Sequence, residues 1–215
     1  KDRGKDRVKA TGEVFTPPIL AKRMVRAIPK TFLESPSSRF LDHSCGDGNF
    51  IVALYEVLTE DFGHSRENVL SRLFAVDLME DNIERLNQRM KVDSTHPNFI
   101  CSDSLTFDFS QLSDSFEVIV GNPPFQGAGK KAAKLWPQFV RLTVDLLSEG
   151  GCGFLITPST WLNRRPTGAW RHFRRVNVTD LWTGLEEFFP GICSTFSATL
   201  FVKETYRGET RVNSS

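Results

Sequence analysis

The stretch R-F-L-D-H-S-C-G-D-G-N-F-I-V-A-L-Y-E-V-L, residues 39 to 58, contains a short strand, a glycine turn and a helix in direct succession. The strand ends at Asp42, and the spacing of apolar residues predicts a helix from about Asn49 to Leu58. Gly46 and Gly48 permit a tight turn and a close approach of the backbone to a ligand. The third glycine of a dinucleotide-binding loop is missing, so the turn alone is a weak signal of function.

The alternation of strand and helix continues on both sides of this stretch. Helices are expected after Thr16-Pro17-Pro18, from the second strand to about Met90, and over 135–147. Further strands are expected at 73–77, 98–103, 116–120, 153–157, 178–185 and 198–203. Strands that alternate with helices form a parallel sheet with helices on both faces. We therefore predict an α/β fold with a mostly parallel seven-stranded sheet and a C-terminal antiparallel hairpin.

Three of the predicted strands end in a carboxylate, at Asp42, Asp77 and Asp103. Ligands of open parallel sheets bind at this end, where Asp77 is placed to accept hydrogen bonds from a ribose and Asp103 to meet an adenine edge. Asp42 and Asp47 add negative charge, which disfavours a pyrophosphate and favours a cationic or neutral nucleoside. S-adenosylmethionine fits, because it has a sulfonium, an ammonium and an adenosine but no phosphate. The alternative is that these residues are turn formers and helix caps.

The fourth strand runs into I-V-G-N-P-P-F, residues 119 to 125. Prolines donate no ladder hydrogen bond, so the strand stops and leaves Asn122 and Phe125 at its tip. The amide oxygen of Asn122 and the main-chain carbonyl of Pro123 are two acceptors that suit an amine with two N–H donors. Phe125 offers a flat face on which a planar ring can stack. The tip therefore suits an exocyclic amine on an aromatic base.

Several segments, in this chain order, resemble the γ-class N6-adenine DNA methyltransferases, a group that includes modification subunits of type I restriction systems and fused restriction–modification enzymes. They are G-E-V-F-T-P-P-I-L-A-K-R-M-V (12–25), D-H-S-C-G-D-G-N-F (42–50), N-P-P-F (122–125), G-F-L-I-T-P-S-T-W-L (153–162) and F-P-G-I-C-S-T-F-S-A-T-L-F-V-K (189–203). The resemblance covers nearly the whole chain. It implies a Rossmann-like methyltransferase fold, S-adenosylmethionine as cofactor and methyl transfer to the N6 amine of a flipped-out adenine.

The resemblance also implies roles for individual residues. Phe15, Thr16 and Pro17 would flank the methionine end of the cofactor, and Leu78 and Leu105 would sandwich its adenine. The full implied cofactor set is Phe15, Thr16, Pro17, Asp42, Ser44, Cys45, Gly46, Gly48, Phe50, Asp77, Leu78, Asp103 and Leu105. The implied methyl-acceptor site is Asn122, Pro123, Pro124 and Phe125. The family often has small residues where this chain has His43-Ser44, and we expect His43 to be a plain loop histidine rather than a titrating group beside the cofactor.

The charges of the chain are unevenly distributed. Between Glu34 and Gly121 there are 16 acidic and 6 basic residues, whereas 126–176 has 9 basic and 2 acidic ones. A base that flips out of a duplex needs phosphate contacts to hold the strand. The candidate nucleic-acid contacts are Lys130, Lys131, Lys134, Arg164, Arg165, Arg171, Arg174 and Arg175. The alternative is a solvated helix face with ordinary core aromatics at Trp161, Trp170 and Phe173.

The chain divides into a polar segment (1–11), a catalytic domain (12–205) and a short tail (206–215). No target-recognition domain fits after the hairpin. The sequence is therefore a piece of a longer chain, or a specificity subunit supplies recognition, or specificity is low. DNA is the expected partner and RNA is less favoured; the sequence does not predict the oligomeric state.

The composition excludes several classes of protein. The formal net charge is +1, so no global charge favours nucleic acid, and no apolar run reaches the about 18 residues of a membrane span. The four cysteines form no C-x-x-C pair, so we expect no metal and a reduced, cytoplasmic protein. Two alternatives to DNA methylation stay open: the same chemistry on an RNA base or a protein glutamine, and a catalytically silent module that binds nucleic acid or a partner.

Overall fold

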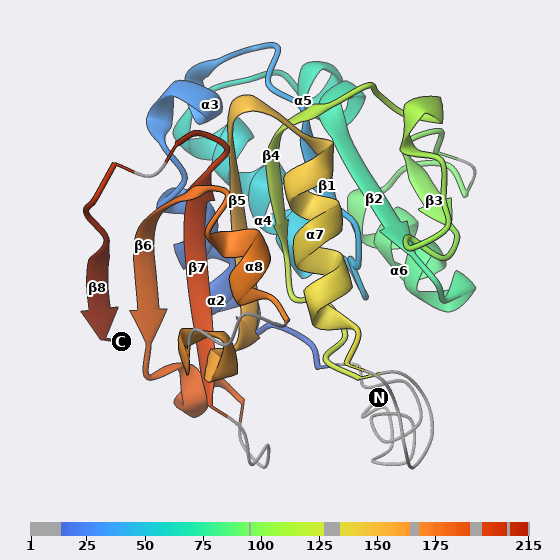
Figure 1. Ribbon diagram of the computed structural model, residues 1–215. Helices are drawn as coiled ribbons and strands as arrows, with labels where there is room; N and C mark the ends of the chain where they lie inside the picture. The colour runs from blue at the N-terminus through green and yellow to red at the C-terminus, as the bar shows by residue number, and fades with distance from the viewer. Residues whose placement is uncertain are drawn as a thin grey trace.

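The computed structural model describes residues 14–94, 96–126, 134–163, 168–189, 195–205 and 207–214. Its helices and strands alternate along most of the chain (Figure 1). The helices, including π and 3-10 turns, are α2 (Pro18–Arg26), α3 (Lys30–Glu34), α4 (Asn49–Glu56), η1 (Val57–Asp61), α5 (Arg66–Arg72), α6 (Glu80–Met90), η2 (Phe109–Gln111), α7 (Trp136–Leu146), η3 (Ser159–Asn163), α8 (Trp170–Phe173) and η4 (Leu185–Phe188). The strands are β1 (Phe40–Asp42), β2 (Leu73–Asp77), β3 (Phe99–Cys101), β4 (Phe116–Gly121), β5 (Leu147–Pro158), β6 (Asn177–Thr183), β7 (Phe196–Val202) and β8 (Arg211–Ser214).

The strands form one sheet in the order β3-β2-β1-β4-β5-β7-β6-β8. Strands β1 to β5 pair in parallel, and β7 pairs antiparallel with β5 on one side and β6 on the other. The predicted parallel sheet with a C-terminal antiparallel pair is confirmed. After β1 the chain adds strands on one side, and from β4 it adds them on the other. The sheet therefore has its topological switch point between β1 and β4, where such folds bind ligands.

Over the described residues the sheet has eight strands, whereas the sequence predicts seven. The additional strand, β8, lies in the tail and pairs in parallel with β6. Its sequence R-V-N-S lacks the alternation of apolar and polar residues that identifies a strand. Backbone pairing at the edge and an ion pair between Arg211 Nε and Asp180 Oδ1 at 2.9 Å hold it instead. Both contacts are made with β6, so the residues of β8 alone contain no pattern that predicts this strand.

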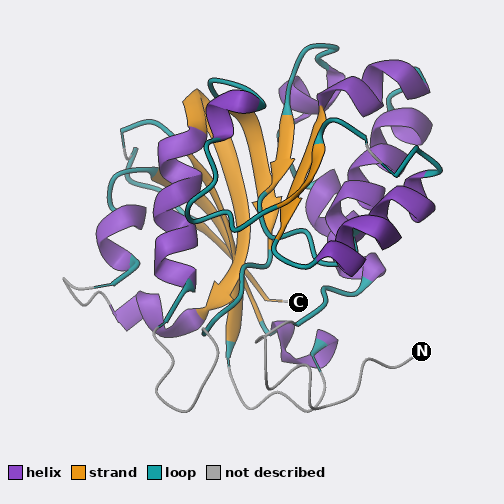
Figure 2. Cartoon of the chain, turned by 90° about the vertical axis from the view of Figure 1, so that its right-hand side faces the viewer, coloured by secondary structure: helices purple, strands orange, loops and turns teal. Residues whose placement is uncertain are grey.

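Helices lie on both faces of the sheet (Figure 2), and a hydrophobic cluster lies between the sheet and the helices on each face. Successive residues of a strand point to opposite faces, so Phe40 packs with α2, α4, α5 and α6 while Leu41 packs with α7 and α8. Burial on both faces explains why the central strands are apolar almost without interruption. Among the described residues, no helix is long and apolar enough to cross a membrane.

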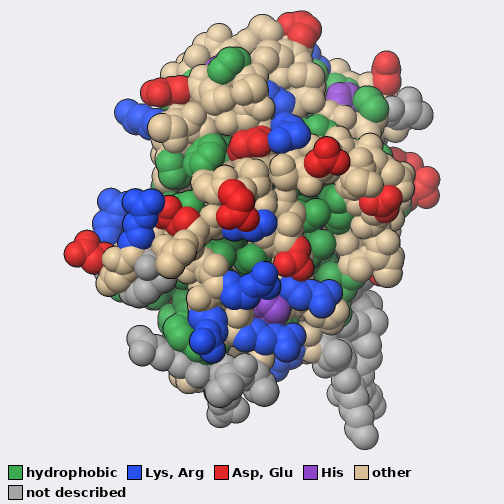
Figure 3. Space-filling view, turned by 45° about the horizontal axis from the view of Figure 1, so that its top comes forward, with side chains coloured by type: hydrophobic (Ala, Val, Ile, Leu, Met, Phe, Trp, Pro, Cys, Tyr) green, Lys and Arg blue, Asp and Glu red, His purple; other side chains and the backbone are tan. Residues whose placement is uncertain are grey.

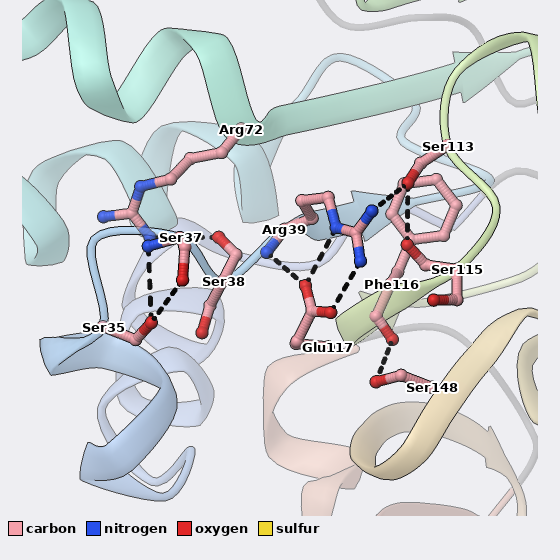
Figure 4. Close-up of polar contacts among 10 residues, drawn as sticks. All are labelled: Ser35, Ser37, Ser38, Arg39, Arg72, Ser113, Ser115, Phe116, Glu117 and Ser148. Atoms are coloured by element: carbon pink, nitrogen blue, oxygen red, sulfur yellow. Dashed lines mark hydrogen bonds and ion pairs between the residues drawn. The ribbon is translucent and has the colours of Figure 1, made fainter.

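The amino ends of β1 and β4 are joined by an ion pair (Figure 4). Arg39 donates from Nη2 to Glu117 Oε1 at 2.8 Å and from Nε to Oε2 at 3.1 Å, and its main-chain N–H donates to Oε2 at 2.8 Å. Such a bidentate contact fixes the relative position of the two side chains and also pairs their charges. It holds β1 and β4 in register at their amino ends, opposite the carboxyl ends where such folds bind ligands.

Candidate active site

A cavity of about 340 Å³ lies at the carboxyl ends of β1, β2, β3 and β4, beside the switch point. It is lined by Val14, Phe15, Thr16, Asp42, His43, Ser44, Cys45, Gly46, Asp47, Asn49, Phe50, Asp77, Leu78, Met79, Asp103, Ser104, Leu105, Asn122, Pro124, Gln126, Leu135 and Phe139. Residues from the N-terminal segment, the glycine turn, four strand tips and α7 thus meet around one space.

The glycine turn is closed by hydrogen bonds to the neighbouring strand. Gly46 N–H donates to Asp77 Oδ2 at 2.8 Å, and Cys45 N–H donates to the Val76 carbonyl at 3.2 Å. Gly46 has a φ of +53°, and a Cβ there would lie 3.0 Å from Cε1 of Phe15. The ring of Phe15 therefore packs directly on the turn, which brings the N-terminal motif to the glycine motif.

The tips of β2 and β3 hold their carboxylates by local contacts. Asp77 Oδ1 accepts hydrogen bonds from Met79 N–H at 3.0 Å and from Asn82 Nδ2 at 2.7 Å. Asp103 Oδ1 accepts from Leu105 N–H at 2.9 Å. These contacts orient the two carboxyl groups at the strand tips. Leu78, 66% exposed, presents its side chain at the cavity between these tips.

The cavity wall is acidic. Four aspartates line it, and the lining residues among the described part of the chain include no Lys or Arg. Burial raises the pKa of Asp42 to about 8; the Ser44 N–H opposes this rise and the charge of Asp77 adds to it. Thr16 Oγ1 and Ser44 Oγ are buried without a hydrogen-bond partner among the described residues. Orphaned polar atoms around an acidic space suit a cationic ligand that has its own donors and acceptors.

Asn122 has one half of its amide fixed and the other half unused. Its Nδ2 donates to the Val14 carbonyl at 2.8 Å, which assigns the amide orientation, because the flipped amide would set two oxygens against each other. Its Oδ1 is buried and has no hydrogen-bond partner among the described residues. Asn122 lines the same cavity as Asp77 and Asp103. The site thus holds a rigid acceptor that lacks a donor.

The other residues of the N-P-P-F segment are divided between the cavity and the core. Pro124 lines the cavity, whereas Pro123 and Phe125 do not. Pro123 is buried, and the half-buried ring of Phe125 stacks on Phe196 with centroids 5.2 Å apart and planes at 29°. Phe196 is 1% exposed and supports one face of Phe125 from the core. Sequence reasoning missed this partner, which lies in another strand.

His43 is buried and connects three elements of the site. Its Nε2 lies 2.6 Å from Thr143 Oγ1 on α7, and its carbonyl accepts from Ser104 Oγ at 2.6 Å. Thr143 Oγ1 donates its proton to the Phe139 carbonyl at 2.9 Å, so it accepts from an Nε2–H of His43. Burial lowers the pKa of His43 to about 4, which keeps the ring neutral.

Most of the predicted site residues meet at this cavity. Of the cofactor set, Pro17 and Gly48 do not line it; Gly48 instead packs against Leu86, where a Cβ would lie 2.4 Å from Cδ1. The lining residues that the sequence did not suggest are Val14, Asn49, Met79, Ser104, Gln126, Leu135 and Phe139. Leu135 and Phe139 belong to the α7 region, where an apolar helical pattern gives no reason to expect a cavity.

The four predicted nucleic-acid contacts that the structure describes, Lys134, Arg171, Arg174 and Arg175, do not line the cavity. Lys134 is exposed just before α7, and Arg171, Arg174 and Arg175 are exposed on and after α8. Lys130, Lys131, Arg164 and Arg165 lie outside the described residues. Among the described residues, no group of three His, Cys, Asp or Glu side chains is arranged to hold a metal ion.

Comparison with known proteins gives matches over most of the chain. The model of the N-6 DNA methylase family matches residues 3–150. The type II methyltransferase M.TthHB8I of Thermus thermophilus is 26% identical over 209 residues, an alignment that covers 85% of this chain and 43% of the relative. The chain therefore spans less than half the length of that relative.

Three solved structures have a similar fold. A putative class I S-adenosylmethionine-dependent methyltransferase from Listeria monocytogenes has a TM-score of 0.72 at 13% identity and covers 93% of this chain and 65% of its own. A modification subunit of a putative type I restriction enzyme from Vibrio vulnificus has a TM-score of 0.69 at 20% identity, over 90% of this chain and 45% of its own. The EcoKI M protein has a TM-score of 0.69 at 17% identity, over 90% and 44%. These likenesses confirm the Rossmann-like fold.

Proposed function

The chain belongs to the N-6 DNA methylase family, and on that premise we propose that it transfers the methyl group of S-adenosylmethionine to the N6 amine of adenine in DNA. The cavity at the switch point is the proposed site of this reaction. The observation that carries the proposal is the tethered amide of Asn122, a residue that lines the cavity and whose buried oxygen has no hydrogen-bond donor among the described residues.

The residues of the cavity fit S-adenosylmethionine. The described wall of the cavity is acidic and includes no Lys or Arg, which suits a molecule that has positive charge and no phosphate. In our assignment Asp77 accepts from the ribose, Asp103 meets the adenine amine, and Leu78 and Leu105 lie on either side of the adenine ring. In the same assignment Phe15 and Thr16 face the methionine end, where Thr16 Oγ1 is buried without a hydrogen-bond partner among the described residues. When bound, the cofactor supplies an electrophilic methyl group.

The acceptor amine would be held at the tip of β4. Asn122 Oδ1 and the Pro123 carbonyl are proposed to accept its two N–H bonds, which directs the nitrogen lone pair at the methyl group. Pro124 keeps the backbone at this tip stiff, and Phe125 stacks on the base with its other face supported by Phe196. No general base is needed before attack, because the proton can leave after the nitrogen becomes cationic. Orientation and proximity supply much of the rate.

The target adenine has to leave the duplex to reach this tip. Flipping a base costs a few kcal/mol, which contacts to the DNA backbone offset. We propose that sequence recognition comes from a partner subunit or from chain outside this sequence, since similar structures include modification subunits of type I restriction enzymes. The proposed activity takes place in the cytoplasm, where DNA and the cofactor are both present.

A transfer assay with tritiated methyl groups tests the proposal against its alternatives. DNA, RNA and protein extract are offered separately, and label is expected in N6-methyladenine of DNA. Label in RNA or protein alone refutes the assigned acceptor, and cofactor binding without any transfer refutes the assigned activity.

Two variants test the assigned roles. Asn122→Ala should bind S-adenosylmethionine in calorimetry and transfer no methyl group, whereas Asp77→Ala should weaken cofactor binding. Asn213→Ala on β8, whose exposed side chain lies far along the chain from the site, is the control and should behave as wild type. The reverse pattern for the first two variants contradicts the assignment.

A further inference from the structure

The face of the molecule formed by α7 and α8 carries a cluster of cationic side chains that is separate from the cavity. Arg141 lies on α7, Arg171 lies on α8, and Arg174 and Arg175 follow α8; all four side chains are exposed. We call these four residues the arginine cluster. Figure 3 shows Lys and Arg side chains gathered around a histidine low on the face that it draws. The cluster is made by two elements that are separate in sequence.

A buried histidine lies beneath the arginine cluster and orients one member. His172 is 5% exposed, and its Nε2 accepts from Arg171 Nε at 3.0 Å. Burial lowers the pKa of His172, and Arg171, Arg175 and Arg141 lower it further, so the ring is neutral. A neutral ring adds no charge and fixes one donor of Arg171. The remaining donors of the guanidinium can meet an anion in a defined geometry.

The arginine cluster is poorly neutralised by the protein itself. Among the described residues, Asp145 is the carboxylate that approaches it, at 3.8 Å from Arg175 Nη1. Both side chains of that pair are more than half exposed, 58% and 52%, and exposed pairs contribute little. Four cations beside one carboxylate repel one another, and a polyanion removes that repulsion.

The exposed side of α7 connects the arginine cluster with the cavity. Gln138 and Arg141 are exposed at positions i and i+3 of α7, which places them on one side of the helix, and exposed Lys134 lies two residues before the helix begins at Trp136. Leu135, next to Lys134, lines the cavity. Positive charge therefore begins at the rim of the cavity and continues to α8, whereas the described cavity wall is acidic. A polyanion is repelled from the wall and attracted along this outer path.

We propose that the arginine cluster, together with Lys134, binds the phosphodiester backbone of the DNA that flanks the flipped adenine. This inference rests on the proposed function for the identity of the polyanion. Arginine forks match phosphate oxygens in pairs, and backbone contacts set the position of a protein on a duplex without reading its sequence. The cluster thus supplies affinity and placement, and the cavity supplies the chemistry.

The salt dependence of DNA binding tests this inference. The triple variant Arg141→Gln/Arg171→Gln/Arg174→Gln loses three cations of the cluster. The control Lys30→Gln/Arg85→Gln/Lys91→Asn removes three exposed cations from α3, α6 and the turn after α6. Removing three phosphate contacts should flatten the log–log salt slope by about 2.7, so wild type loses about 40-fold more affinity than the triple variant between about 50 and 200 mM salt. The probe is a DNA duplex of random sequence.

The control variant should keep the wild-type slope, and calorimetry with S-adenosylmethionine confirms that each variant is folded. If the triple variant fails to fold, Arg141→Gln/Arg174→Gln leaves the contact with His172 intact and should flatten the slope by about 1.8. An unchanged slope in the folded cluster variants, or an equal change in the control, overturns the inference. Methyl transfer by wild type is measured separately. Cluster-dependent binding without transfer refutes the proposed function alone, and transfer with cluster-independent binding refutes the inference alone.

Discussion

The buried carboxyl group of Asp42 should make cofactor binding depend on pH. Burial raises its pKa to about 8, so before the cofactor binds the group is protonated below that pH. A cation favours the ionised form, so binding should strengthen as pH rises toward about 8 and should release a proton. With a pKa of about 8, about one hundredth of the protein is ionised at pH 6 and about one tenth at pH 7. Apparent affinity follows that fraction, so the dissociation constant should fall about ninefold between these pH values.

Two titratable groups next to Asp42 keep their charge in this window. The pKa of His43 is about 4 and that of the Cys45 thiol is raised by burial, so neither group changes its charge there. The α-amine of the cofactor stays largely cationic below its ordinary pKa of about 8. The charge of Asp77 acts on Asp42, and the charge of Asp47 acts on Cys45 in the loop that follows Asp42. The variant Asp42→Asn leaves both aspartates in place.

Calorimetry at pH 6 and pH 7, in buffers of different ionisation enthalpy, measures both the affinity and the number of protons released. Wild type should release close to one proton at pH 7, and Asp42→Asn should show neither the release nor the ninefold change. A flat wild-type affinity refutes the link between burial of Asp42 and cofactor binding. The same pH dependence in Asp42→Asn assigns it to another group.

Three other changes have expected outcomes that follow from the structure. Thr143→Val leaves Nε2 of His43 unpaired and should lower the free energy of unfolding by about 1–3 kcal/mol in a denaturant titration. The control is Thr59→Val, which should cost less because the hydroxyl of Thr59 donates to carbonyls of its own helical segment. Gly48→Ala combines a positive φ with a Cβ that would lie 2.4 Å from Leu86. It should therefore lower the melting temperature more than Gly63→Ala, where φ is +70° and no described atom lies within 4 Å of the added Cβ. An equal loss of melting temperature in the two variants would show that Leu86 moves aside freely. Phe125→Ala should lower kcat/KM for DNA by the factor that corresponds to about 1–3 kcal/mol, the contribution of one stacked base, and should leave the affinity for the cofactor unchanged. A loss of cofactor affinity would contradict the assignment of Phe125 to the acceptor site.

The local pattern of the sequence was sufficient for the architecture and for the position of the cavity. Apolar runs of strand length between helical repeats predict a parallel sheet, and residues placed just after such runs come to one edge of it. Asp42, Asp77, Asp103 and Asn122 therefore meet at one cavity for a reason that spacing alone expresses. The apolar pattern did not predict strand β8, because an edge strand can be held by backbone pairing without an apolar face.

Only the tertiary structure decided the state and the partners of those groups. The amide of Asn122 is oriented by Val14, 108 residues away, and His43 is joined to Thr143 on a helix that it meets only after folding. Asp42 becomes a weak acid because packing removes water from it, and four arginines become one surface because α7 packs beside α8. Hydrogen-bond partners, desolvation and charge clustering depend on distances through space, and residue order does not contain those distances until the chain has packed.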